Sequence, residues 1–221
     1  MKASEWRTRF ARMALAAGLL WLTGCSHSII VEGTVPTPLI EPLPARVNVI
    51  TQPAFNSYVH SEKLPRGGGT WRIEVGQLNQ SFFNKLLNSL FEGVNYTAME
   101  NCGVPEAQPV ELDCPDGSLR IELTEYAFLT PALSGLNVFS VSVKYQLSLM
   151  GKDGEPLGDW TVTGFGKSQS QAFQANKALN QASVEAIRDA GARIAIEWPR
   201  QDHVAAWIDQ LVLDAEAKEQ R

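Results

Sequence analysis

The strongest structural signal in this sequence is the stretch from Phe139 to Leu149, which reads FSVSVKYQLSL. Apolar and polar side chains alternate along it without a break. Successive side chains of a β-strand point to opposite faces, so the pattern predicts a long strand with one buried face and one face that water can wet. We expect the fold to form around a sheet that contains this strand.

The segments on either side predict its neighbours. Residues 119–124 alternate in the same way, and residues 160–164 follow a Lys-Asp-Gly-Glu turn in which Asp-Gly favours a tight hairpin. The three segments together predict an antiparallel meander. Residues 46–50 and 71–75 alternate over shorter lengths and predict two further strands, with residues 51–69 as a loop between them.

Three segments have helical periodicity. Residues 77–92 carry a broad apolar face, which predicts a helix buried on the sheet and stopped by Gly93. Residues 169–196 carry small apolar residues at three- and four-residue spacing, which permits a helix to approach the sheet closely. After Trp198-Pro199, the apolar stripe of a last helix predicts packing within the chain, whereas an exposed stripe would favour a partner-binding face. The stripe consists of Val204, Trp207, Ile208, Leu211, Val212 and Ala215.

Length and composition fit one folded domain. The chain has 221 residues, of which 44% are hydrophobic, with nine Phe and six Trp, and this is typical of a globular protein. The patterns predict an α+β fold, with a mostly antiparallel sheet, a central meander and helices on one face. We divide the chain into a signal peptide (1–24), a Pro-rich tether (25–44), an α/β domain (45–198) and a C-terminal amphipathic helix (199–221).

The tether holds four prolines and little periodicity. Proline removes hydrogen-bond donors and favours extended backbone, so we expect a semi-rigid spacer in front of the domain. The apolar residues of the tether leave a partly docked arm as an alternative. These residues are Ile29, Ile30, Val31, Leu39 and Ile40.

The N-terminus has a basic head and a short apolar run that ends in Leu22-Thr23-Gly24-Cys25. The run is shorter than the roughly 20 residues that a spanning helix needs, which indicates a secretory signal that is removed. The tetrapeptide resembles the bacterial lipobox. That resemblance implies cleavage before Cys25, a diacylglycerol thioether on its thiol and acylation of its amine, which together hold a protein stably on a membrane. An ordinary signal peptide with a chance cysteine and an uncleaved anchor are the alternatives.

Residue type and charge then indicate the location. Ser26 follows the cysteine, whereas Asp at that place retains lipoproteins of the resembling family at the inner membrane, so we expect the periplasmic side of the outer membrane. The whole chain carries a charge of −5 and its first 24 residues carry +3, which leaves the mature chain near −8. A negative charge argues against nucleic acid and against electrostatic docking on anionic lipid. We expect the membrane contact to be the lipid alone.

Two cysteines remain after Cys25. Cys102 and Cys114 form an even pair in an oxidising compartment and predict a disulfide, which would stabilise the fold by roughly 3 kcal/mol for a loop of this size. A two-cysteine metal site is the alternative, but no His or third Cys lies near. We expect no metal site, and no cofactor besides the acyl groups on Cys25.

The sequence offers little for catalysis. His60 and His203 are the histidines outside the tether, and neither a Gly-x-Ser-x-Gly nor a His-Glu-x-x-His motif occurs. Carboxylates such as Glu122, Glu125 and Asp159 would have to pair in space to support glycoside chemistry. We therefore expect that the protein is not an enzyme.

The order of predicted elements resembles the small α/β domain of YajG-like lipoproteins and the N-terminal domain of the Tol-system β-propeller protein. The resemblance rests on the strand and helix at 71–91 and on the run from Val141 through the Ala-rich helix. It implies a protein that assists envelope assembly, secretion or transport by binding other proteins. No functional residue can be carried over from it.

Two surfaces are candidates for such a partner. The strand at 138–149 could offer main-chain pairing as a sheet edge, and the loop at 130–136 could offer apolar contact. Leu133, Leu136 and Val138 are the candidate contact residues, although the loop could instead fold back on the core. The alternative function is a carrier or chaperone for lipid or glycan, which a contiguous apolar cavity larger than about 300 Å3 would favour.

Overall fold

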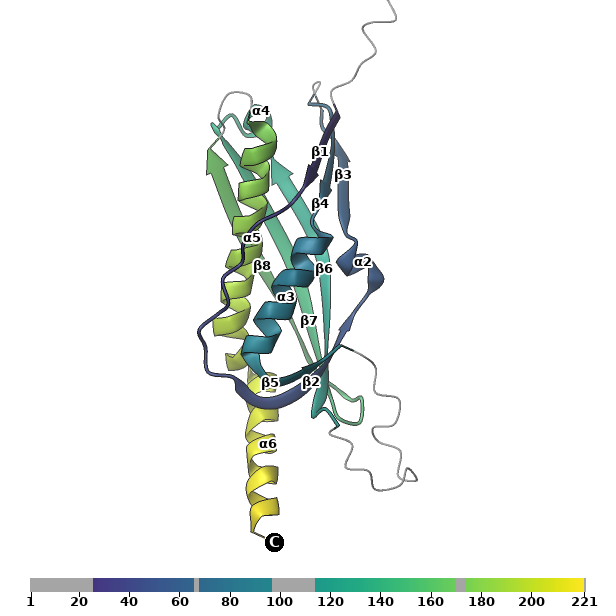
Figure 1. The fold of residues 1–221 in the computed structure, drawn as a ribbon, viewed down its shortest axis with the longest axis vertical. Helices are drawn as coiled ribbons and strands as arrows, with labels where there is room; N and C mark the ends of the chain where they lie inside the picture. The colour runs from purple at the N-terminus through teal and green to yellow at the C-terminus, as the bar shows by residue number, and fades with distance from the viewer. Residues whose placement is uncertain (1–25, 66–67, 97–113, 170–173, 221) are drawn as a thin grey trace, which may run out of the picture.

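The alternating stretch forms the central strand of a computed structural model (Figure 1). Strand β7 (Val138–Gly151) lies between β6 (Gly117–Leu129) and β8 (Pro156–Gln169) and pairs antiparallel with both. The tight turn before β8 places Gly154 at φ 82°, a conformation that glycine adopts without strain. The predicted meander is confirmed. The structure describes residues 26–65, 68–96, 114–169 and 174–220.

The meander belongs to a five-stranded sheet of order β5-β2-β6-β7-β8. Strand β2 (Leu43–Thr51) runs parallel to β6 and to β5 (Phe91–Asn95), so the sheet is mixed. A smaller sheet has β4 (Thr70–Glu74) between β1 (Ser26–Ile30) and β3 (Val59–Lys63). The fold is α+β in one domain, as predicted.

Two helices, α3 (Gly76–Leu90) and α5 (Ala175–Glu197), cover one face of the larger sheet (Figure 1). Every second residue of β7 from Phe139 to Leu149 is buried in the core, and the residues between them are half-exposed. The remaining helical elements are the short helices α2 (Pro53–Asn56) and α4 (Pro131–Ser134), the 3-10 helix η2 (Trp198–Arg200) and the C-terminal helix α6 (Asp202–Glu219).

Glycines on β8 let α5 approach closely. A Cβ atom at Gly166 would lie 2.0 Å from the carbonyl oxygen of Ala182, and one at Gly164 would lie 2.1 Å from that of Ala186. Real side chains do not approach so near, so only glycine fits at these two positions of the strand. The predicted close approach of the Ala-rich helix is confirmed, and the strand contributes as much to it as the helix does.

Two buried tyrosines tie the sheet to these helices. The hydroxyl of Tyr145 donates to Asn79 Oδ1 of α3 at 2.7 Å, and the hydroxyl of Tyr126 lies 2.7 Å from Ser183 Oγ of α5. Burial removes both hydroxyls from water and raises the pKa of each tyrosine well above its usual value. The neutral hydroxyls therefore act as structural hydrogen-bonding groups.

The described part of the predicted tether (25–44) is docked on the domain, as the partly docked alternative expected. Residues 26–30 form β1, and Val31 and Val35 are buried beyond it. The backbone of Glu32 exchanges two hydrogen bonds with the Asn180 side chain of α5, at 2.8 and 3.0 Å. These contacts order the segment because they remove apolar side chains from water and satisfy backbone groups that proline-rich chain usually leaves to solvent.

Two local predictions are corrected by the structure. The segment at 51–69 is not only a loop, because it contains α2 and β3. Strand β3, with the sequence VHSEK, buries no side chain fully, so its residues show no apolar alternation from which a strand could be predicted. The helix α3 ends at Leu90 rather than at Gly93, and Gly93 lies inside β5 against the side chain of Arg46. The chain passes directly from helix to strand there.

Candidate functional site

The three predicted contact residues lie in different surroundings. Leu133 is half-buried and packs against the core, so the alternative of a loop that folds back holds for this residue. Val138 is half-buried at the start of β7. Leu136 is 63% exposed. The structure therefore leaves only Leu136 of the three as an exposed contact residue.

Leu136 belongs to a well-defined turn. The backbone N–H groups of Leu133 and Ser134 both donate to the carbonyl oxygen of Thr130 at 3.0 Å, which closes the single turn of α4. Gly135 then takes a left-handed conformation at φ 69°, which favours glycine. Leu129, just before the turn, is 50% exposed. This ordered turn thus holds two apolar side chains in solvent, and we call residues 129–136 the apolar turn.

The predicted sheet edge at 138–149 is not an edge. Strand β7 pairs with β6 on one side and β8 on the other along nearly its whole length, so its backbone hydrogen bonds are used inside the sheet. The free edge beside it belongs to β8, because β8 ends the strand order. Main-chain pairing with a partner could only occur there or at the opposite edge of the sheet.

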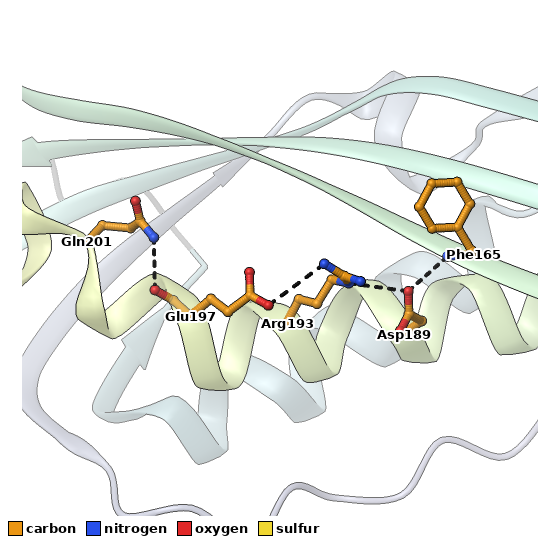
Figure 2. Close-up of polar contacts among 5 residues, drawn as sticks. All are labelled: Phe165, Asp189, Arg193, Glu197 and Gln201. Atoms are coloured by element: carbon orange, nitrogen blue, oxygen red, sulfur yellow. Dashed lines mark hydrogen bonds and ion pairs between the residues drawn. The ribbon is translucent and has the colours of Figure 1, made fainter.

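Helix α5 occupies part of the β8 edge. The backbone N–H of Phe165 donates to Asp189 Oδ2 at 3.0 Å, and the backbone N–H of Lys167 donates to Glu185 Oε2 at 3.3 Å (Figure 2 shows the first). An added strand would need these same N–H groups. The two carboxylates therefore hinder strand addition along this stretch of β8.

A line of polar contacts continues from this edge toward α6 (Figure 2). Arg193 Nε lies 3.4 Å from Asp189 Oδ2, and Arg193 Nη1 lies 3.8 Å from Glu197 Oε1. The Gln201 amide then donates to the carbonyl oxygen of Glu197 at 3.0 Å. These exposed pairs each contribute little, about 0.3–0.5 kcal/mol for the i,i+4 ion pairs, but they connect α5 to the corner at which α6 begins.

Helix α6 leaves the domain after Leu211. Val204 and Trp207 are buried, and Trp207 packs close to Gly117 at the start of β6. From Val212 to the end of the described chain every residue is exposed, and Figure 1 shows this half of α6 extending beyond the sheet. The predicted packing within the chain is therefore right for the first half of the helix only. In the second half the stripe residues Val212 and Ala215 are exposed to solvent.

The hollows of the described structure have mixed walls. One of about 330 Å3 lies between β2, α2 and α3, and two of about 430 and 520 Å3 lie near the start of α5. The first has Phe55, Phe83 and Leu87 in its wall, but Thr51 and Asn84 interrupt the apolar surface. The other two have mainly polar side chains around them. None of these three is the contiguous apolar cavity that a lipid carrier would need.

The residues considered for catalysis are held apart. Glu122 accepts a hydrogen bond from the Gln52 amide at 2.9 Å, Glu125 pairs with Lys144 at 2.6 Å, and Asp159 is exposed on β8. The three carboxylates thus have different neighbours rather than one another. Among the described residues, no group of three or more His, Cys, Asp or Glu is placed to hold a metal ion.

The two histidines serve packing in this structure. His60 Nε2 lies 3.2 Å from Glu62 Oε2, and its ring packs against the rings of Tyr126 and Phe128. The ring of His203 fills the space beside Gly158, where a Cβ atom would come within 2.6 Å of it.

The predicted modification sites lie mostly outside the described residues. Cys25 and Cys102 are among the residues that the structure leaves out, so the lipid anchor and the pairing of Cys102 with Cys114 stay predictions. Cys114 itself is half-buried and disulfide-bonded. No helix in the described ranges is both long and apolar enough to cross a membrane.

Comparisons with known proteins identify similar structures but no family. No family model and no curated protein matches the sequence. The crystal structure of XCC0632 from Xanthomonas campestris, a DUF330 protein, is 13% identical, covers 77% of this chain and 92% of that chain, and gives a TM-score of 0.47. A proposed lipoprotein from Caulobacter crescentus is 18% identical, with coverages of 43% and 68% and a TM-score of 0.30. Lipoprotein GNA1162 from Neisseria meningitidis is 15% identical, with coverages of 64% and 96% and a TM-score of 0.30.

These scores are too low to carry an argument about activity. The surfaces of this chain must therefore be interpreted from its own contacts. The chain is similar in structure, at low sequence identity, to proteins that include bacterial lipoproteins.

Proposed function

We propose that this protein is a lipid-anchored, non-catalytic accessory of the bacterial outer membrane, facing the periplasm, which binds another envelope protein through the projecting half of α6. The observation that carries the proposal is the exposure of this half, from Val212 onward, in a helix whose apolar stripe continues past the domain. The anchor rests on the lipobox resemblance at Cys25. The absence of a catalytic role is part of the proposal.

The stripe supports binding because it is continuous. Val204, Ile208, Leu211 and Ala215 recur at three- and four-residue spacing, which places them on one side of a helix. Val204 is buried, Ile208 and Leu211 are half-buried against the core, and Ala215 is exposed. The same surface that packs against the domain therefore becomes available to a second molecule farther along the helix.

An uncovered helical segment of this length gains little stability from its own backbone. Helices shorter than about 12–15 residues are marginal in water unless packing supports them. Val212, 39% exposed and beside the stripe, adds apolar surface that covering would remove from water. A groove with apolar walls on another protein would supply that cover, as in the recognition of amphipathic helices by grooves. The acidic residues Asp209, Asp214 and Glu216 favour a basic rim around such a groove.

Site-specific photo-crosslinking in cells tests the proposal. A photoreactive residue in place of Ala215, on the stripe, should form an adduct with one envelope protein. The matched control replaces Leu213, which lies on the opposite side of the same helix and should give a much weaker adduct. In the Val212→Ser variant the Ala215 adduct should fall by about tenfold, which corresponds to about 1.4 kcal/mol of lost apolar contact.

The controls separate binding from folding and from anchoring. Val212→Ser should leave the thermal unfolding midpoint of the domain nearly unchanged, because Val212 is 39% exposed and exposed substitutions usually cost less than about 0.5 kcal/mol. The Cys25→Ser form should lose its tight fractionation with membranes. Equal adducts from positions 213 and 215 would contradict the helix as the binding surface. Co-purifying lipid or glycan without any protein adduct would favour the carrier alternative.

A further inference from the structure

A chain of ring contacts connects the start of the described chain to the apolar turn. The His27 ring stacks on the Trp71 ring, with centroids 4.0 Å apart. The Trp71 ring in turn packs on the Phe128 ring at 5.6 Å. Phe128 is followed directly by Leu129, the first residue of the apolar turn. The N-terminal strand and the apolar turn therefore lie at the same end of the domain, where Figure 1 shows β1 entering and α4 closing the meander.

Cys25 directly precedes the first strand of the domain in the sequence. Strand β1 begins at Ser26, which pairs with Thr70 at the start of β4. In the described residues no spacer precedes β1, because Pro36, Pro38 and Pro42 follow β1 and Pro44 lies in β2. Acyl groups on Cys25 would therefore bring the bilayer surface directly to this end of the domain.

We propose that the apolar turn, residues 129–136, inserts its exposed leucines into the interfacial region of the bilayer that holds the Cys25 lipid. The proposal rests on the lipid anchor of the proposed function and adds a protein contact to the lipid contact expected from the sequence. The occupant of this surface is a lipid bilayer rather than a second protein. Leu129 and Leu136, 50% and 63% exposed, then leave water, which is the favourable term.

The contact is apolar rather than electrostatic. The mature chain is near −8 in net charge, which opposes attraction to anionic lipid. At this end Lys63 ends β3, Lys177 lies in the first turn of α5 and Lys167 lies near the end of β8, while Glu62 lies beside Lys63 and Glu185 accepts a hydrogen bond from the backbone of Lys167. These few mixed charges give no strong field of either sign. The insertion should therefore occur equally well in zwitterionic membranes and should be insensitive to salt.

The orientation also fits the rest of the molecule. The projecting half of α6 lies at the opposite end of the longest axis from β1 and α4 (Figure 1). With the apolar turn seated on the bilayer, α6 points away from the membrane. Three exposed apolar residues then lie at different distances from the membrane: Leu136 in the turn, Phe165 on β8 and Leu213 on α6. Their side chains are 63%, 58% and 59% exposed.

These three residues provide a matched experiment on the lipidated protein in phosphatidylcholine vesicles. Leu136→Cys, Phe165→Cys and Leu213→Cys variants are each labelled with an environment-sensitive fluorophore after reconstitution. Quenching is then measured in vesicles whose acyl chains carry bromine. We expect strong quenching and a blue-shifted emission for the label at position 136 only, unchanged between low and high salt.

Each outcome decides a separate point. Labels at positions 136 and 213 that are quenched equally little would overturn the proposal, provided that the protein floats with the vesicles. A label at position 136 that is shielded from aqueous iodide but not quenched by bromolipid would assign the turn to a protein contact and also overturn it. Failure of the wild-type protein to float with the vesicles would refute the lipid anchor, and with it the proposed function. It would not bear on whether the apolar turn inserts into the bilayer. A Leu129→Ser variant, which alters the turn without moving the label, should reduce the quenching at position 136 by at least about twofold.

Discussion

Removal of the buried Tyr145 hydroxyl should destabilise the domain more than the loss of one ordinary hydrogen bond. Tyr145 and Asn79 are both fully buried, and the hydroxyl donates to Asn79 Oδ1 at 2.7 Å. Within the described structure, Asn79 Nδ2 has no hydrogen-bond partner. In Tyr145→Phe the whole Asn79 amide would therefore remain buried without a partner. Such a group costs about 1–3 kcal/mol, so we expect the free energy of unfolding to fall by about 2 kcal/mol.

A second substitution turns this estimate into a double-mutant cycle. Asn79→Leu alone should also cost about 1–3 kcal/mol, because it leaves the Tyr145 hydroxyl buried and unpaired. The combination of Tyr145→Phe with Asn79→Leu removes both polar groups, and replacement of both partners by apolar groups of similar shape can be nearly neutral. The double variant should therefore be more stable than the sum of the single effects by about 1–3 kcal/mol.

Urea unfolding of the non-acylated Cys25→Ser form, followed by circular dichroism, measures all four members of the cycle. The slope of free energy against urea should stay constant across them, because the surface exposed on unfolding does not change. Strictly additive single effects would refute the reasoning, since they would show that the two groups do not depend on each other. A loss below about 0.5 kcal/mol in Tyr145→Phe would refute it as well.

Two further predictions concern the same core. Burial raises the pKa of Tyr145 and of Tyr126, so above pH 10, where the same side chains ionise in the unfolded chain, the folded state holds more protons. The contribution of these two tyrosines to the free energy of unfolding should therefore be constant below pH 9 and fall above about pH 10. The fall should reach up to about 1.4 kcal/mol per pH unit for each tyrosine. Urea titrations at pH 9 and 11 measure it. A Tyr145→Phe variant should show about half of that fall. Separately, Gly166→Ala should lower the thermal midpoint, because its Cβ would lie 2.0 Å from a backbone oxygen of α5 and overpacking of this kind costs about 1–3 kcal/mol. Gly154→Ala, at a turn where a Cβ meets nothing within 4 Å, should show only the cost of a left-handed alanine, about 1–2 kcal/mol. A smaller loss for Gly166→Ala than for Gly154→Ala would contradict the close approach.

The elements with strong periodicity were predictable, and those without it were not. The alternation at 139–149 and the apolar face at 77–92 each contain enough residues to define a strand and a helix, and both elements are present. Strand β3 has no alternation because it buries none of its side chains fully, so only its pairing with β4 reveals it. Strand β1 looked like part of a proline-rich spacer because its apolar residues are too few to show a period.

The candidate surfaces were harder to predict than the elements. The sequence indicates an apolar loop, a long strand and an amphipathic last helix, but it cannot show which of them stay uncovered. In the structure β7 is interior, Leu133 packs inward, and the second half of α6 stands free. Each of these outcomes depends on where a neighbouring element ends. The exposed half of α6, for example, begins where the sheet stops.

By itself the sequence determined the α+β class, the meander and the three long helical segments, and it showed a resemblance to the lipobox at Cys25, because all of these are local patterns within one turn, one strand or one short motif. The tertiary structure alone decided that the arm after Cys25 is docked, that α5 hinders strand addition at the β8 edge, and that the apolar turn lies beside the N-terminal strand. Those features depend on contacts between residues far apart in the chain, such as His27 with Asn176, 149 positions away. Side-chain periodicity reports which face of an element is apolar, whereas only the packing of distant elements decides whether that face meets protein, water or a membrane.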